Sequence, residues 1–412
     1  MTTRGSATTR RQPKPLRTAL VNELSAQGII RTPSVENALR AVPRHILVPD
    51  VSLEEAYAVH WPASDDGHPM PNEPTIAAVL LELAQTLPGM RVLKIGSTTA
   101  YPPALLSHLT GEHGEVTSMN TDGDLGQAIA DQLSLTGYDT IRVINGNARD
   151  GYADAAPYDR LISFNGVWDV PPAWLCQTAP DGRLVVPLRM RGSVYRVLAL
   201  TRTNDHWEAA ATEACTFARR LGGIADDPLT MVSLTTSGSV TLHLHQDQHI
   251  DPVNLLGVLN RPRSEFWTNV PITFGSRNSD YSLLELFLSV TMREGLSRMD
   301  ASKEAIDTAV VDPAFPWGSM AVPGPNGDLA YLTIQPTGEA EFGEPVYKIG
   351  VIGHGSGSHT LAGHLTDQIR LWDRDYRQAA LRVALQHADA PQGITGTYGL
   401  NRPNTRLTVS WG

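Results

Sequence analysis

Residues 89–105 constrain the fold of this chain more than any other stretch. Arg91 to Ile95 is a short apolar-rich run ending at Gly96, and apolar positions with helical spacing resume at Ala104 after a turn of small residues. This order predicts a strand, a tight turn and a helix. In an open α/β sheet, the backbone N–H groups of such a turn and the helix N-terminus face a bound nucleotide-like ligand. Any α/β protein contains similar units, so the pattern by itself leaves ordinary scaffold as an equal alternative.

Strands and helices alternate on both sides of this unit. Helices are predicted at 16–27, from 32 or 34 to 42, from 75, at 124–135 and at 172–177, and strands at 116–119, 141–145, 158–164, 182–188 and 194–200. The alternation predicts a mostly parallel sheet with an antiparallel pair at its far edge. Between the first helices, Pro43 and Pro49 predict an extended segment at 41–49. Beyond about residue 220 the segments become β-rich, which predicts a second, smaller α+β domain.

Composition limits the class of protein. A chain of 412 residues exceeds a single typical core, so we expect two domains. No apolar run is long enough to span a bilayer and no signal peptide follows the N-terminal arginines, so the chain is expected in the cytoplasm and away from membranes. A net charge of −10 argues against nucleic-acid binding, although residues 1–15 form a locally basic tail that we expect to be disordered. Cys176 and Cys215 are expected to be small core residues.

Five motifs carry a family resemblance. They are Ala-Val-Pro-Arg-His-Ile-Leu-Val-Pro (41–49), Ala-Tyr (56–57), Val-Leu-Lys-Ile-Gly (92–96), Ala-Pro-Tyr-Asp-Arg-Leu-Ile (156–162) and Gly-Arg-Leu-Val-Val-Pro (182–187). Their order and intervals resemble protein L-isoaspartate O-methyltransferases across roughly residues 16–200. In the C-terminal half, Pro-Ala-Phe-Pro-Trp-Gly (313–318), Gly-Val-Ile-Gly-His-Gly (350–355) and Leu-Trp-Asp-Arg-Asp (371–375) resemble the FxLD-system methyltransferases of lanthipeptide-type gene clusters.

The resemblance implies a fold, a reaction and a partner. It implies a Rossmann-like class I methyltransferase domain at 16–215 and a family-specific α+β domain at 216–412. The implied reaction moves a methyl group from S-adenosylmethionine to an aspartyl or isoaspartyl carboxylate of a ribosomally made peptide. The enzyme mainly has to align the carboxylate oxygen with the methyl carbon and exclude water.

The resemblance also implies the site residues. Cofactor contacts fall at Lys94, Gly96, Ser97, Thr98, Tyr101, Asn120, Gly146, Asn147 and Ala148, catalytic positions at Asn72 and His45, and substrate contacts at Glu73 and Arg44. For His45, structural pinning of the 41–49 segment is the alternative.

Several of these positions depart from the family pattern. Lys94 stands where the family has an acidic residue, and Thr98 and Ala100 replace glycines, which is costly for alanine if its φ is positive. Asn120 and Asn147 replace acidic residues and can accept hydrogen bonds only without charge assistance. The catalytic loop reads Asn72-Glu73-Pro74 instead of Ser-x-Pro.

Two hypotheses follow from these departures. The chain is either a methyltransferase with a relaxed cofactor site, or a protein that kept the fold while losing or replacing the chemistry, such as a peptide-binding partner. Lys94 would suit an anionic ligand such as phosphate in the second hypothesis, and an exposed surface lysine is the alternative.

Three further patterns have a functional and a structural interpretation. His243 and His245 share one face of a strand as a conceivable metal pair, and a solvated edge strand is the favoured interpretation. The glycine-rich run at 353–357 resembles a phosphate cradle but lacks the following lysine, which favours a plain turn between strand and helix. Core or interface positions are favoured for Trp168, Trp174, Trp317, Trp372 and Trp411.

Overall fold

The computed structural model describes residues 12–48, 51–61, 70–71, 73–214, 229–274, 279–341, 343–391 and 398–412. These residues form two compact units. The first contains the described residues up to 164 together with 177–185, and the second contains 165–176 and the described residues from 186 onward. In the described ranges, no helix combines the length and apolar character needed to cross a membrane.

The first unit is built on a parallel sheet. Its strands are β3 (Arg91–Ile95), β4 (Glu115–Asn120), β5 (Arg142–Asn145), β6 (Tyr158–Ser163) and the start of β7 (Thr178–Arg191). The unit also contains a separate short antiparallel pair, β1 (His60–Trp61) and β2 (Met70–Pro71). The order is β7-β6-β3-β4-β5 with parallel pairing throughout. The chain runs outward from β3 through β4 and β5 and then returns to β6 on the other side of β3. The carboxyl end of β3 is therefore a topological switch point, where α/β sheets bind ligands.

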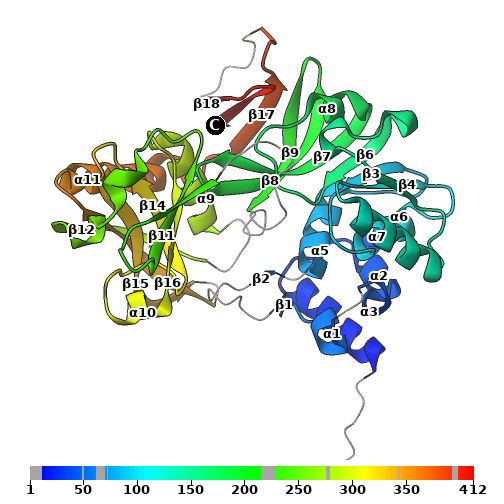
Figure 1. Cartoon of the computed structure of the whole chain (residues 1–412), viewed down its shortest axis with the longest axis horizontal. Helices are drawn as coiled ribbons and strands as arrows, with labels where there is room; N and C mark the ends of the chain where they lie inside the picture. Colours follow the sequence, from blue (N-terminus) through cyan, green and yellow to red (C-terminus); the bar gives the residue numbers. More distant parts are fainter. Residues whose placement is uncertain are drawn as a thin grey trace, which may run out of the picture. The chain divides into compact units, whose positions relative to one another are not determined.

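Helices surround this sheet. They are α1 (Pro13–Ala26), α2 (Pro33–Ala41), α3 (Arg44–Leu47), α4 (Leu53–Ala56), α5 (Glu73–Ala84), α6 (Tyr101–Thr110) and α7 (Gly123–Leu135). Of these, α6 packs against β3 and β4, and α7 packs against β4 and β5 (Figure 1). Asp122 starts α7 by accepting the Asp124 and Leu125 N–H groups, both at 3.0 Å. The first helix begins at Pro13, inside the segment predicted as a disordered tail, and residues 1–11 lie outside the described part of the chain.

The segment at 41–49 differs from its prediction. It was expected to be extended, yet Arg44–Leu47 forms one helical turn, α3. Pro43 precedes this turn and so does not interrupt it, and the Val48 N–H closes the turn on the Arg44 carbonyl at 3.1 Å. The turn buries Arg44 and Leu47 completely. Burial of this helical face outweighs the extended preference of the flanking prolines.

The second unit is a mixture of antiparallel sheets and helices. Its strands are β8 (Val194–Thr203), β9 (His206–Ala214), β10 (Leu229–Ser233), β11 (Val240–His245), β12 (Arg263–Ile272), β13 (Ser297–Ala301), β14 (Gly318–Pro323), β15 (Leu329–Glu341), β16 (Glu344–His354), β17 (Leu381–His387), β18 (Tyr398–Asn401) and β19 (Thr405–Trp411). A seven-stranded sheet has the order β10-β11-β13-β14-β15-β16-β12, and the other strands follow the order β18-β19-β17-β9-β8.

The helices of the second unit complete its core. They are α8 (Pro172–Gln177, whose last residue belongs to the first unit), α9 (Asp280–Thr291), α10 (Lys303–Asp307) and α11 (Ser358–Leu371). Phe287 of α9 and Leu365 of α11 pack with Leu332 and Val351 of the seven-stranded sheet, and Trp372 lies fully buried beside them. A second apolar cluster, including Leu242 and Tyr331, lies elsewhere in the unit.

This architecture confirms the predicted class, a Rossmann-like α/β domain followed by an α+β C-terminal part. The boundary expected between 215 and 216 falls at the edge of residues 215–228, which lie outside the described part of the chain. That boundary stays a prediction.

Candidate cofactor site

The turn after β3 contains two consecutive residues in the left-handed region. Gly96 has φ 80° and Ser97 has φ 76°, and the Gly96 N–H donates to the Met119 carbonyl at 3.0 Å, which ties the turn to β4. Ala100, in contrast, has φ −76°. Ala100 therefore does not carry the backbone strain expected of an alanine at positive φ. Within this turn, Ser97 is the non-glycine residue with a positive φ.

The start of α6 offers few free N–H donors. The Tyr101 N–H is held by the Thr99 hydroxyl at 3.3 Å, and Pro102 and Pro103 have no N–H group. The Ala104 N–H is already used by the Ala100 carbonyl at 3.3 Å. This helix end therefore lacks the backbone donors that bind phosphate at other helix N-termini. The expectation that N–H groups of the turn before α6 face a bound ligand stays a prediction.

Asn120 ends β4 as a buried polar side chain. It is 2% exposed, and neither its amide oxygen nor its amide nitrogen has a hydrogen-bond partner among the described residues. Its backbone carbonyl accepts the Gly146 N–H at 3.0 Å, so the loop after β5 lies beside it. A buried amide without partners costs about 1–3 kcal/mol, which a ligand able to hydrogen-bond with it would recover.

The loop after β5 turns directly into a short helical segment, η1 (Ala148–Asp150). The Arg149 N–H donates to the Asn147 side-chain oxygen at 3.1 Å, and Ala148 is 1% exposed. Asn147 itself is exposed. The structure thus brings Asn120 and the Gly146–Ala148 loop together at the carboxyl edge of the sheet, beside the strand that carries the Gly96–Ser97 turn.

Lys94 is a fully buried residue in β3. Its ammonium donates to the Ser118 hydroxyl of β4 at 3.2 Å. The interpretation of Lys94 as an exposed surface lysine is therefore wrong. Sequence reasoning missed Ser118 as the polar partner of Lys94, because the two residues lie on neighbouring strands 24 positions apart.

Arg44 and His45 contact the protein itself. Arg44 is fully buried, donates to the Ala56 carbonyl at 2.9 Å and lies 5.8 Å from the Tyr101 ring centre. His45 Nδ1 lies 2.8 Å from the Tyr57 hydroxyl. Burial, and secondarily the nearby Arg17, lowers the pKa of His45 below its usual value. These contacts favour structural pinning by His45 and a supporting role for Arg44 beneath α6.

Two of the predicted loop residues have no described side chain. Asn72 lies outside the described part of the chain, and Glu73 is described only by its backbone, as the first residue of α5. Their catalytic and substrate roles stay predictions. Thr98 is exposed in the turn that leads to α6.

The histidine pair of β11 lies in the interior of a sheet. His243 and His245 are 2% and 6% exposed, because β11 is flanked by β10 and β13. The interpretation as a solvated edge strand is therefore wrong. His243 pairs with Asp300 at 2.7 Å and His245 lies 3.1 Å from the Ser193 hydroxyl. Among the described residues, no group of three or more potential ligands could hold a metal.

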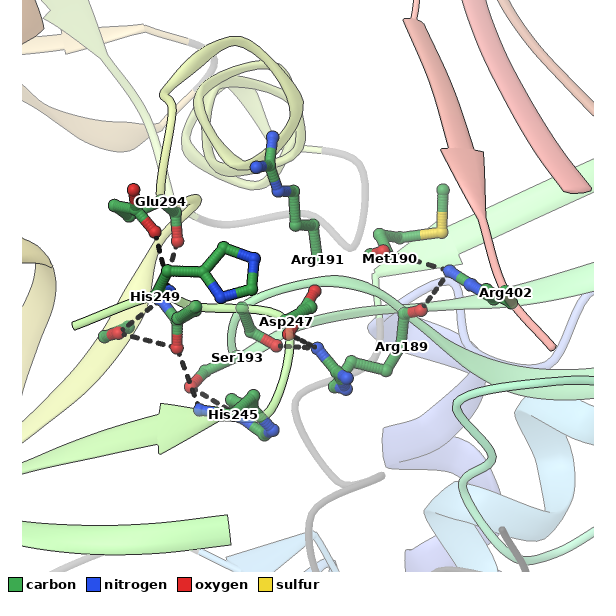
Figure 2. Close-up of polar contacts among 12 residues, drawn as sticks. Arg189, Met190, Arg191, Ser193, His245, Asp247, His249, Glu294 and Arg402 are labelled. Atoms are coloured by element: carbon green, nitrogen blue, oxygen red, sulfur yellow. Dashed lines mark hydrogen bonds and ion pairs between the residues drawn. The ribbon is translucent and has the colours of Figure 1, made fainter. Parts of the chain in front are cut away.

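Figure 2 shows the polar network around His245 in the second unit. Buried Arg189 pairs with Asp247 at 3.0 Å, and Arg402 donates to the Arg189 and Met190 carbonyls at 2.7 and 3.0 Å. The His249 N–H donates to the Glu294 carboxylate at 3.0 Å. Most of these bonds satisfy backbone groups, so the network holds turns of the second unit in place.

The glycine-rich run at 353–357 is a plain turn, as the sequence favours. It joins β16 to α11, and the Asp328 carboxylate accepts the Gly357 N–H at 2.9 Å, so a protein side chain already occupies this helix start. Trp174 and Trp372 are core residues as expected. Cys176 is exposed, which corrects its expected place in the core, and Cys215 lies outside the described residues.

Comparisons with known proteins point to one family. The family model described as protein-L-isoaspartate(D-aspartate) O-methyltransferase matches residues 16–221. A protein-L-isoaspartate O-methyltransferase of Methanopyrus kandleri is 32% identical over 215 residues, which cover 52% of this chain and 90% of that protein. The corresponding protein of Methanothermobacter thermautotrophicus is 28% identical over 214 residues, covering 52% of this chain and 94% of its own.

Two solved structures with related descriptions align with the chain at low scores. A protein-L-isoaspartate O-methyltransferase structure aligns over 96% of this chain and 99% of its own, with 18% identity and a TM-score of 0.44. A Plasmodium falciparum structure described as a complex with S-adenosyl-L-homocysteine covers 46% of this chain and 90% of its own, with 18% identity and a TM-score of 0.39. Both scores are low, so the sequence matches carry the comparison.

Proposed function

Because the chain belongs to the protein-L-isoaspartate(D-aspartate) O-methyltransferase family, we propose that it transfers a methyl group from S-adenosylmethionine to a peptide carboxylate. S-adenosylmethionine is the methyl donor of this family. The proposed substrate group is an aspartyl or isoaspartyl side chain. The motifs at 313–318 and 350–355 support a ribosomally made precursor peptide as the substrate, with the C-terminal part helping to recognise it.

One observation carries the cofactor assignment. The Asn120 amide is buried without a partner among the described residues, at the end of β4 and beside the Gly146 loop. Ribose hydroxyls both donate and accept hydrogen bonds and therefore suit a side chain that has one acceptor and one donor group to satisfy. We assign the ribose to Asn120, the adenine to the Gly146–Ala148 loop, and the methionine part to the Gly96–Ser97 turn.

The start of α6 supports a ligand without phosphate. Pro102 and Pro103 remove N–H donors, and the Tyr101 N–H is already bonded to Thr99. Such a helix end is poorly suited to a phosphorylated nucleotide. A nucleoside linked to an amino acid through sulfur does not require those donors. The buried position of Lys94 likewise disfavours the phosphate hypothesis.

The chemistry makes modest demands on the protein. The bound sulfonium supplies an electrophilic methyl group, and the substrate carboxylate is already an anion at neutral pH. The proposed task of Asn72 is to orient that carboxylate, and Glu73 would limit which carboxylates approach. The contacts of Arg44 with Ala56 and Tyr101 support a role in fixing the first turn of α6. Orientation and exclusion of water then account for most of the rate.

Calorimetric titration with S-adenosylmethionine and S-adenosylhomocysteine tests the proposal first. We expect binding in the micromolar range, and we expect ATP, used as a control ligand, not to bind. Methyl transfer is then measured with an isoaspartyl peptide and with a ribosomally made precursor peptide of the lanthipeptide type. No binding at millimolar cofactor would overturn methyl transfer and favour a peptide-binding protein that has lost the chemistry.

A further inference from the structure

We propose that Gln177 is a positioning residue that sets the cofactor site's preference for adenine. The inference rests on the proposed function, because it concerns the loop assigned to the adenine. Gln177 ends α8 and belongs to the first unit, as does the loop after β5. It is far from that loop in the sequence, and no motif singles it out.

The Gln177 amide clamps the segment that follows η1. Its oxygen accepts the Tyr152 N–H at 2.8 Å and its nitrogen donates to the Asp150 carbonyl at 2.7 Å, while the side chain is only 8% exposed. Gly151, between these two partners, has φ 60°, and a Cβ there would lie 2.3 Å from the Gln177 oxygen. The glutamine and the glycine therefore fit each other closely.

This clamp is connected to the predicted adenine loop through the backbone. The Asp150 N–H donates to the Asn147 carbonyl at 3.0 Å, and the Gly151 N–H donates to the Ala148 carbonyl at 3.3 Å. At its other end, the Tyr152 carbonyl accepts the hydroxyl of fully buried Tyr158 at 2.7 Å. Gln177 thus holds a segment whose first residues are Asn147 and Ala148.

The clamp has a consequence for base selection. The Arg149 N–H donates to the Asn147 side-chain oxygen, which fixes that atom as the acceptor of the amide. An acceptor at this position suits the 6-amino group of adenine and repels the 6-keto group of hypoxanthine. Rotating the amide to present its nitrogen instead would break the bond from Arg149. As long as η1 keeps its place, the loop favours adenine.

Two ligands and three variants test the inference. S-adenosylhomocysteine and S-inosylhomocysteine differ at the 6-position of the base, and calorimetry gives the ratio of their dissociation constants. We expect the wild-type protein to prefer the adenine ligand about tenfold or more, and Gln177→Met to lose most of that preference. Gln177→Glu keeps the acceptor for Tyr152 but loses the donor for Asp150, so an intermediate ratio is expected.

The controls separate positioning from general stability. Gln127→Met alters an exposed glutamine of α7 that donates to Asp131 at 2.8 Å, and its ratio should equal the wild-type ratio. Amide hydrogen exchange should accelerate at Tyr152 in Gln177→Met, because its N–H loses its acceptor. If Gln177→Met affected only general stability, its melting temperature would change while the ratio of the two dissociation constants stayed at the wild-type value.

The outcomes are distinct. A wild-type protein that binds neither ligand overturns the proposed function and this inference together. A wild-type preference that persists in both Gln177 variants overturns only the inference. If Gln177→Met does not fold, the ratio measured for Gln177→Glu decides.

Discussion

Asn120 illustrates how a single residue exchanges stability for binding. Its amide is buried at 2% exposure without a partner among the described residues. Asparagine and leucine have similar shapes, so leucine would remove the unsatisfied groups without leaving a cavity. Aspartate would place an unpaired charge in the same buried position. The two substitutions should therefore move stability and affinity in opposite directions.

We expect Asn120→Leu to raise the free energy of unfolding without ligand by about 1 kcal/mol and to weaken S-adenosylhomocysteine binding about tenfold or more. Asn120→Asp should lower that free energy and tighten binding, because a carboxylate forms charge-assisted bonds with ribose hydroxyls. Urea denaturation and calorimetry measure both quantities. If Asn120→Leu binds the ligand as tightly as the wild type, Asn120 does not contact it.

Side-chain burial was the least predictable property of this sequence. Cys176 is expected in the core and is exposed, and Lys94, for which an exposed surface position is one of two interpretations, is fully buried. Burial of a lysine depends on its neighbour across the sheet, here Ser118, which is 24 residues away. The residues next to Lys94 in the sequence therefore do not reveal that it is buried. The position of Asn120 was predictable because it follows from the end of a strand.

At the scale of elements, long amphipathic and apolar runs were predicted well. The first helices, β3 and the strands that follow it lie where periodicity placed them, because each has a clear apolar pattern bounded by glycine or proline. One helical turn, α3, was missed because a segment of this length has no periodicity to detect. Its helical form depends on the burial of Arg44 and Leu47.

The turn between β16 and α11 requires glycine for two reasons. Gly355 has φ 114°, and a Cβ there would lie 2.3 Å from an Asp328 carboxylate oxygen. Gly363, inside α11, has open space instead, because a Cβ added there would meet no atom within 4 Å outside its own helix backbone. The same substitution should therefore have opposite effects at these two glycines.

Gly355→Ala should lower the free energy of unfolding by about 2–4 kcal/mol, because it adds both backbone strain and a steric clash. The matched control, Gly363→Ala, should raise it by about 0.5–1 kcal/mol, because alanine restricts the unfolded chain and favours the helix. Urea denaturation of the full chain measures both changes. A Gly355→Ala protein as stable as the wild type would contradict the assigned role of Asp328.

At the scale of the whole molecule, two titratable groups of the second unit, partly buried Glu285 and buried His354, act on stability with opposite signs. Burial raises the pKa of Glu285 to about 7 from 4.5, and the nearby Tyr281 hydroxyl and Arg196 offset this only in part. Burial lowers the pKa of His354, which is 4% exposed and stacks on Tyr331. Raising the pH therefore disfavours folding through Glu285, and lowering it below the usual histidine value disfavours folding through His354.

The variant Glu285→Gln separates the first of these effects. In the wild type, the stabilising contribution of the protonated Glu285 carboxyl is fully present below about pH 4.5. It is lost as the pH rises through about 7, because the carboxyl keeps its proton to a higher pH in the folded protein than in the unfolded chain. We expect the free energy of unfolding of the variant, relative to that of the wild type, to rise by roughly 2–3 kcal/mol as the pH is raised from 5 to 8. Urea denaturation across this range measures the difference. A flat difference between Glu285→Gln and the wild type across this range would refute the assignment.

The two prolines at the start of α6 also bear on what the protein can sense. A cell contains many phosphorylated derivatives of adenosine. The occupancy of a site that bound their phosphate groups would change with the energy state of the cell. This helix end leaves few N–H groups to hold them. We therefore expect occupancy to follow the balance between the methyl donor and its demethylated product, so that the protein responds to methylation capacity and not to energy charge.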